Sequence, residues 1–147
     1  MLTRVHYALT PDVLQVLMTM GHGDSIAIVD ANFPATSVAA KTCTKVPVEW
    51  PIDTMLALEA VLEHFPLDPY DPEVAPVQGM AVVDEPDTMP AVVAEAAPLF
   101  TAAGGFETHL VERHAFYGLT EKCFAIIRTA ERRPYGNFIL RKGVVSS

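Results

Sequence analysis

Segments with helical and with strand-like patterns alternate along this sequence, and this alternation restricts the possible folds more than any other feature. Thr10 and Pro11 suit the cap and the first turn of a helix, and apolar residues follow them at helical spacing up to Met20. Residues 25–29 form a short apolar run, typical of a strand buried on both faces, and the run stops at Asp30. The chain is therefore predicted to begin with a helix followed by a buried strand.

The alternation continues to the end of the chain. The pattern predicts a helix from near Pro51 to before Pro66, a strand over 77–83, a helix that begins at Pro90, is interrupted at Pro98 and ends at Gly104–Gly105, a weakly alternating segment over 107–112, a short helix over 115–122, and strands over 124–129 and 138–141. A length of 147 residues suits one core. We therefore expect an α/β fold in which residues 1–147 form a single layered domain, with a mixed or partly parallel sheet and helices on its faces.

Charge and composition argue against several classes of function. The 10 basic residues against 18 acidic ones give a net charge of −8, whereas binding to a phosphate backbone needs the opposite balance, so no nucleic-acid partner is expected. No apolar stretch suits a membrane span or a signal peptide, so we expect a cytoplasmic protein without a membrane partner. Cys43 and Cys123 lack metal-ligand spacing, and we interpret them as free, buried thiols rather than as a metal site.

A histidine between two glycines follows the first predicted helix, in the segment Met-Gly-His-Gly-Asp at residues 20–24. The imidazole of His22 could donate to the unpaired carbonyls at the end of that helix, where a cationic ring is also favoured. It could instead transfer protons near neutral pH, and the flanking glycines leave it little crowded for this role. Asp24 is better interpreted as a turn residue or as a cap.

Polar side chains also lie where two predicted strands meet turns. Asp30 ends a buried apolar run, and a carboxylate there must be solvated in a cleft or paired, because burial alone is costly. Tyr135 and Asn137 lie in a Pro-Tyr-Gly-Asn turn before the last strand, where the phenol stays partly exposed and the amide supplies both donor and acceptor. Clefts at strand ends are where α/β sheets bind ligands, so these residues predict a site for a polar ligand.

The remaining aromatic and histidine residues carry less information. The histidines at 6, 64, 109 and 114 have no partner visible in the sequence, and we interpret them as structural or surface residues. Tyr117 and its aromatic neighbour could simply anchor a short helix in the core. Trp50 could cover the core or stack on a sugar face, and the sequence leaves both roles open.

Six short segments stand in order along nearly the whole chain at mutually compatible spacing. They are residues 14–24 with Met-Gly-His-Gly-Asp, 30–35 with Asp-Ala-Asn-Phe-Pro-Ala, 66–70 with Pro-Leu-Asp-Pro-Tyr, Arg113 with Ala115-Phe116-Tyr117, 124–137 from Phe-Ala-Ile through Glu131 to Tyr-Gly-Asn, and 140–144 with Leu-Arg-Lys-Gly-Val. Together they resemble the RbsD/FucU family, and its fucose mutarotase branch more closely than its ribose pyranase branch.

The resemblance implies an isomerase of carbohydrate metabolism that interconverts the α and β anomers of a free monosaccharide, in the first place L-fucose, without cofactor or metal. It also implies an RbsD-like fold and a homo-oligomer, either a ring or a larger, decamer-like assembly. By the same resemblance His22 is the proton donor, and the residues that bind the sugar are Asp30, Asp68, Arg113, Tyr117, Tyr135 and Asn137.

Anomer exchange requires one proton delivered to the ring oxygen and another removed from the anomeric hydroxyl. His22 can supply the first, and Asp30, or a tyrosine or water relay, can accept the second. Two alternatives stay open. One is exchange between the pyranose and furanose forms of a pentose such as D-ribose, and the other is a sugar-binding or regulatory module without turnover.

One geometric point concerns the distance between the two catalytic candidates. An extended segment over 25–29, at about 3.3 Å per residue, would place His22 and Asp30 roughly 20 Å apart, too far for one small sugar to touch both. Either the His22 loop folds back along the strand, or two subunits share the site. Sharing would also account for the 50% of hydrophobic residues, so we expect a homo-oligomer whose dissociated monomer is inactive.

Overall fold

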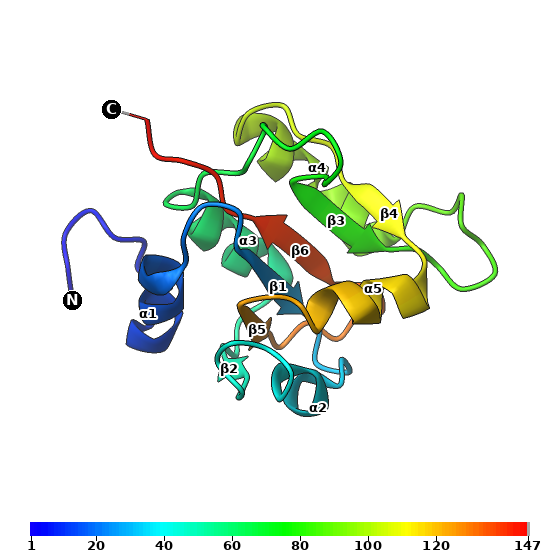
Figure 1. The fold of residues 1–147 in the computed structure, drawn as a ribbon, viewed down its shortest axis with the longest axis horizontal. Helices are drawn as coiled ribbons and strands as arrows, with labels where there is room; N and C mark the ends of the chain where they lie inside the picture. Colours follow the sequence, from blue (N-terminus) through cyan, green and yellow to red (C-terminus); the bar gives the residue numbers. More distant parts are fainter. Residues whose placement is uncertain (147) are drawn as a thin grey trace.

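A mixed six-stranded sheet forms the centre of the structure, a computed structural model that describes residues 1–146 (Figure 1). Its strands are β1 (Ser25–Val29), β2 (Val48–Glu49), β3 (Val77–Met80), β4 (His109–Val111), β5 (Ala125–Arg128) and β6 (Phe138–Arg141), in the order β2-β5-β1-β6-β3-β4. Strand β6 runs antiparallel to its neighbours β1 and β3, and the other pairs are parallel. The predicted mixed sheet is confirmed.

Helices cover both faces of this sheet. They are α1 (Pro11–Thr19), α2 (Ala35–Ala39), α3 (Thr54–Leu62), α4 (Ala91–Ala102) and α5 (Arg113–Thr120). Side chains alternate across β1, so that Ile26 and Ile28 pack in one core cluster with α1, α3 and α4, whereas Ala27 and Val29 pack in a second cluster with α2 and α5. Two cores on opposite faces explain why β1 is apolar at nearly every position.

The first helix begins as predicted and ends on a lysine from the far end of the chain. The Thr10 side chain accepts a hydrogen bond from the Val13 N–H, and Pro11 occupies the first turn. At the other end, Lys142 Nζ donates to the carbonyls of Leu17 (2.9 Å) and Met20 (2.6 Å). A cation therefore already satisfies carbonyls at the C-terminal end of α1.

The prediction that Pro98 interrupts a helix is wrong, because α4 runs through it from Ala91 to Ala102. Pro98 and Ala94, whose carbonyl loses its helical donor, both lie on the exposed side of the helix. The opposite side packs into the core through Val92, Val93, Ala96 and Phe100. Burial of this apolar side outweighs the local cost of the proline.

Other boundaries shift by a few residues, and two short elements were not predicted. Helix α3 begins at Thr54, where Asp53 caps the Leu56 N–H, rather than near Pro51, and β3 ends at Met80 rather than at Val83. The predicted segments 107–112, 115–122 and 124–129 correspond to β4, α5 and β5. The missed elements are α2 and β2, which are too short to show a period in the sequence.

Trp50 and Cys123 are buried, whereas Cys43 is exposed. Trp50 is a core residue, only 1% exposed, and its Nε1–H donates to the Ala8 carbonyl at 2.9 Å. Cys123 is buried as predicted, and burial raises the pKa of its thiol to about 12. The prediction that Cys43 is buried is wrong, because it lies in the irregular, largely exposed segment between α2 and β2.

Within residues 1–146 none of the helices combines the length and the apolar run that crossing a membrane requires.

Candidate functional site

The site residues form two groups at opposite ends of β1 and β6, two strands that are neighbours in the sheet (Figure 1 shows both strands). The His22 group, which consists of His22, Asp68 and Arg141, lies where β1 begins and the antiparallel β6 ends. The Asp30 group consists of Asp30, Tyr135 and Asn137, joined by Arg113 and Tyr117, and lies where β1 ends and β6 begins. The length of a five-residue strand separates the two groups.

The His22 loop does not fold back toward Asp30. The Gly23 N–H donates to the Lys142 carbonyl at 2.8 Å, and the Lys142 N–H donates to the Asp24 carbonyl at 2.8 Å. These two bonds continue the pairing of β1 with β6 beyond Ser25 and Arg141, and hold the loop at that end of the sheet. Gly23 adopts φ +85°, a conformation that favours glycine. One of the two geometric alternatives from the sequence is thereby excluded.

Asp68 is the centre of the His22 group. Its Oδ2 lies 3.3 Å from His22 Nε2 and accepts a hydrogen bond from Arg141 Nε at 3.0 Å, while its Oδ1 accepts from the Tyr70 N–H at 3.0 Å. The Asp68 carboxylate is 1% exposed, whereas the His22 ring is 52% exposed. The buried carboxylate thus orients an imidazole that solvent and a ligand can reach.

The charge state of Asp68 follows from competing effects. Burial raises its pKa, but the hydrogen bonds from Tyr70, Arg141 and His22 outweigh that effect, and the pKa lies below its ordinary value of 3.8. Asp68 is therefore ionised near neutral pH. Its Oδ2 faces His22 Nε2, so it can accept the hydrogen of that ring nitrogen and fix the orientation of the imidazole.

The structure tests one of the two roles considered for His22, that of a helix cap. Lys142, not His22, donates to the last carbonyls of α1. Asp24 acts as a turn residue, as predicted, because its Oδ2 accepts from the Gly21 N–H at 2.7 Å. His22 is therefore paired with Asp68 rather than used as a helix cap.

Asp30 and Asn137 form a closed pair of hydrogen bonds at the other end of the strands. The Asp30 N–H donates to Asn137 Oδ1 at 2.9 Å, and Asn137 Nδ2 donates back to Asp30 Oδ2 at 3.0 Å. The Asn32 N–H donates to the second carboxylate oxygen at 3.0 Å. Burial of Asp30 raises its pKa, and the hydrogen bonds from Asn32 and Asn137 offset that rise only in part. A carboxylate with a raised pKa is better matched to accepting a proton near neutral pH.

Tyr135 presents a phenol beside this pair. Its backbone is in the left-handed region, at φ +63°, and its hydroxyl oxygen accepts a hydrogen bond from the Val83 N–H at 3.2 Å. The acceptor role leaves the hydroxyl hydrogen free to be donated to a ligand. Within this group, Tyr135 is therefore oriented by the chain that follows β3.

Arg113 and Tyr117 reach the same end of the sheet from α5. The Arg113 guanidinium lies 6.0 Å from the centre of the Tyr117 ring, and that ring lies 5.3 Å from the ring of Phe33, just after Asp30. Arg113 lines a cleft of about 560 Å³ together with Val83 and seven other residues, which are Ala81, Val82, Asp84, Pro86, Leu110, Glu112 and His114. The cleft is large enough for a monosaccharide and adjoins the segment that contacts Tyr135.

The sequence missed Arg141 as a site residue, although it lies in one of the segments that carry the resemblance. Its Nε binds Asp68 and its Nη2 lies 3.1 Å from Asp71. As the last residue of a strand it showed no functional pattern, and the only available signal was a cation at a strand end together with two acidic residues at 68 and 71. Among residues 1–146 there is no group of three or more His, Cys, Asp or Glu side chains arranged to hold a metal ion.

Comparisons with known proteins show which sequences this chain is similar to. Residues 4–145 match the sequence profile of the RbsD / FucU transport protein family. The chain is 39% identical over 142 residues to a fucose mutarotase of Danio rerio, which covers 93% of this chain and 90% of the relative. It is 35% identical over 146 residues to an L-fucose mutarotase of Haemophilus influenzae, which covers 98% of this chain and 97% of the relative.

Solved structures show the same similarity. The fucose mutarotase of Streptococcus pneumoniae in complex with L-fucose aligns with a TM-score of 0.86 at 33% identity, covering 99% of this chain and 100% of that chain. The RbsD of Bacillus subtilis complexed with D-ribose aligns over 99% of this chain and 100% of that chain, with a TM-score of 0.72 at 22% identity. The second similarity is one of fold alone.

Proposed function

Since the chain belongs to the RbsD/FucU family, we propose that it is a mutarotase, an isomerase that interconverts the α and β anomers of free L-fucose. The observation that carries this proposal is the half-exposed His22 imidazole held by the buried, ionised Asp68. This arrangement supplies a proton donor on a fold that aligns over its full length with a fucose mutarotase bound to L-fucose.

The reaction needs an acid and a base on the two oxygens of the anomeric carbon. His22 donates a proton to the ring oxygen while Asp30, or a tyrosine or water relay, accepts the proton of the anomeric hydroxyl. The ring then opens, the aldehyde rotates, and the ring closes on its other face with the proton transfers reversed. Each positioned proton transfer typically contributes on the order of 10² to 10⁴ in rate.

The other residues of the two groups would hold the sugar. Asn137 and the Tyr135 hydroxyl offer donors to sugar hydroxyls, and Asp30 offers an acceptor. Arg113 lines the adjacent cleft, and the Tyr117 ring offers an apolar face for the sugar. Asp68 is only 1% exposed, so it would act on the sugar through His22 rather than by the direct contact that the resemblance implies.

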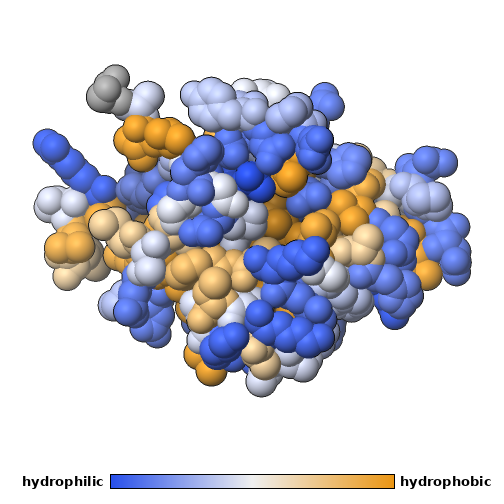
Figure 2. Space-filling view, in the orientation of Figure 1, coloured by the Kyte–Doolittle hydropathy of each residue, from blue (hydrophilic) through white to orange (hydrophobic). Residues whose placement is uncertain are grey.

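We further propose that two subunits of a homo-oligomer, a ring or a decamer-like assembly, share each site. The His22 loop is held at one end of the strands and Asp30 lies at the other, so a second subunit is needed to bring both groups to one sugar. Apolar side chains on the surface of the monomer suit such contacts (Figure 2). The large exposed ones are Met1, Leu2, Tyr7, Met18, Val46, Tyr70, Val83, Met89, Val144 and Val145.

We place this enzyme in the cytoplasm. Both cysteines are free thiols, a state that suits a reducing compartment. The reaction outlined above uses only side chains of the protein and a free monosaccharide, so it requires no membrane or nucleic-acid partner.

Saturation-transfer NMR of L-fucose, with D-ribose measured alongside, tests the function. The wild type should exchange the L-fucose anomers, and His22→Ala should lower the exchange rate by about a hundredfold or more while most of the sugar binding remains. His109→Ala, at an exposed histidine on β4, is the matched control and should leave exchange unchanged.

Two other outcomes would replace the proposal. Faster exchange between the ring forms of D-ribose than between the anomers of L-fucose would indicate a pyranase. If the protein binds sugars but exchanges neither the anomers nor the ring forms of any of them, it is a binding or regulatory module.

A further inference from the structure

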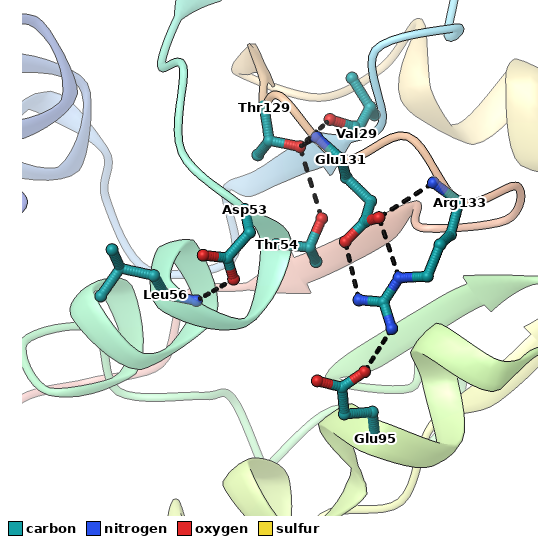
Figure 3. Close-up of polar contacts among 8 residues, drawn as sticks. All are labelled: Val29, Asp53, Thr54, Leu56, Glu95, Thr129, Glu131 and Arg133. Atoms are coloured by element: carbon teal, nitrogen blue, oxygen red, sulfur yellow. Dashed lines mark hydrogen bonds and ion pairs between the residues drawn. The ribbon is translucent and has the colours of Figure 1, made fainter.

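Glu131 is a buried carboxylate that the reaction outlined above does not use. It lies in the turn between β5 and β6, and its side chain is only 5% exposed. Arg133 folds back onto it, and donates from its backbone N–H (2.9 Å), its Nε (3.0 Å) and its Nη2 (2.9 Å) to the two carboxylate oxygens (Figure 3). The remaining guanidinium nitrogen, Nη1, pairs with Glu95 on α4. We call Glu131, Arg133 and Glu95 the Glu131 clamp.

Glu131 touches both segments that carry the Asp30 group. Its carbonyl accepts a hydrogen bond from the Ala31 N–H at 2.8 Å, one residue after Asp30. Its Cγ packs so closely on Gly136 that a Cβ there would lie 2.8 Å from it, and the same Cβ would lie 3.6 Å from the Asp30 side chain. One residue therefore contacts the immediate neighbours of Asp30, Tyr135 and Asn137.

The start of the turn is fixed to β1 as well. Thr129 Oγ1 donates to the Val29 carbonyl at 2.9 Å and accepts from the Glu131 N–H at 3.3 Å (Figure 3). Thr54 Oγ1 of α3 lies 3.4 Å from the same oxygen. The turn is thus tied to β1, which Asp30 directly follows, while the clamp ties it to α4.

The charge of Glu131 makes the buried carboxylate dependent on its pairing with Arg133. A buried carboxylate is unfavourable unless it is paired and fully hydrogen-bonded. Removal of one partner leaves the other as a buried, unpaired charge, which destabilises the folded protein. The hydrogen bonds and charge of Arg133 lower the pKa of Glu131 to about 2 against the effect of burial, and Glu131 and Glu95 together raise the pKa of Arg133. The pair is therefore fully charged at any pH at which the protein would work.

We propose that the Glu131 clamp is a positioning device, which sets the separation between Asp30 and the Tyr135–Asn137 turn and so determines how well the sugar binds. This inference rests on the proposed function, because it assigns the clamp to the sugar-binding half of that site. None of its three side chains needs to touch the sugar. Glu131 acts through the backbone of Ala31 and through its packing on Gly136.

Arg133→Met tests the proposal from the exposed end of the clamp, where the substitution threatens the fold least. The matched control is Arg128→Met, which removes a similar two-pronged pair with Glu49 at 2.5 and 3.1 Å on the neighbouring strand β2. Both variants and the wild type are measured for the KM and kcat of L-fucose anomer exchange. Amide hydrogen exchange at Ala31 and at Ile28 is followed in the same samples.

The clamp predicts a local and specific effect. Arg133→Met should raise the KM by roughly tenfold, because misplaced positioning contacts weaken binding of the sugar, and it should also lower kcat, because Asp30 is the proposed proton acceptor. In Arg133→Met the Ala31 amide should exchange its hydrogen faster while the core amide of Ile28 stays protected. Arg128→Met should change neither the KM nor the exchange rate of the Ala31 amide. Glu131→Gln, which keeps the shape and the acceptor oxygen, should restore part of the binding lost in Glu131→Leu.

The opposite results are equally clear. A KM for Arg133→Met equal to that of Arg128→Met, with Ala31 still protected, would overturn the inference. Faster exchange at both Ala31 and Ile28 would also overturn it, since the pair would then support the fold as a whole. If the wild type exchanges no anomers, it is the proposed function that fails, and this result is distinct from the other two.

Discussion

At the scale of single residues, His22 and Lys142 have different partners at the end of α1, and this difference determines the role that the loop after α1 can have. From the sequence, His22 suited a helix cap as well as a proton donor. Lys142, which is 120 positions away in the chain, takes over the cap in the folded protein and leaves His22 beside Asp68. No local pattern could reveal this, because the competing partner comes from the last strand region.

Asp68→Asn tests whether the buried carboxylate acts through His22. The amide keeps the shape and can still accept from the Tyr70 N–H, but it removes the negative charge beside the imidazole. We expect kcat for anomer exchange to fall by about tenfold or more, part of what a positioned proton transfer contributes. Asp71→Asn is the control, because Asp71 binds the same arginine without contacting His22 in the structure. Equal kcat values for the two variants would contradict the role of Asp68.

The pairing of Glu131 predicts a pH-dependent contribution to stability. Its pKa is lowered from 4.5 to about 2 in the folded protein, so its stabilising effect is present above pH 4.5 and is lost as the pH falls toward about 2. Glu131→Gln should therefore lower the free energy of unfolding at pH 7, and the difference from the wild type should shrink through this window. Denaturant unfolding at several pH values measures it, and a difference that stays constant down to pH 2 would show that the charge is irrelevant.

At the scale of helices and strands, the elements whose bounds could be predicted from the sequence are the ones that are most fully buried. The bounds of β1 and β6 agree with the sequence, because a strand buried on both faces reads as an unbroken apolar run between polar residues. Helix α2 and strand β2 were missed because five and two residues cannot show a period. At Pro98 the local rule failed, since burial of the inner side of α4 carries the helix past a proline on its exposed side.

Pro98 therefore destabilises α4, and a substitution can remove this destabilisation. Pro98→Ala should restore the N–H that the Ala94 carbonyl lacks, and should stabilise the protein by about 1–3 kcal/mol. Pro11→Ala provides the control, because proline is favoured in the first turn of a helix and its removal should bring no gain. The midpoint of denaturant unfolding measures both, and an unchanged or lower midpoint for Pro98→Ala would show that α4 is adapted to the proline.

At the scale of the whole molecule, the site could be predicted only as a set of residues. The residues at 22, 30, 68, 113, 117, 135 and 137 lie in two places, which the topology of the sheet holds at opposite ends of β1 and β6. The length of residues 25–29 already indicated that His22 and Asp30 are too far apart for one sugar. The sequence left two alternatives, a loop that folds back along the strand and a site shared between subunits. Because the His22 loop is held away from Asp30, we propose that subunits share the site, and on that proposal a dissociated monomer should be inactive when size and exchange rate are measured at the same dilution.

Mixed oligomers test the central claim most directly. His22→Ala and Asp30→Asn each damage a different half of the site, so each homo-oligomer should exchange L-fucose anomers poorly. When the two variants are co-expressed in equal amounts, random assembly should combine an intact His22 with an intact Asp30 in about a quarter of the sites, and exchange should recover to about that fraction of the wild-type rate. A mixture no more active than the two variants measured separately would contradict a mutarotase site that is shared between subunits.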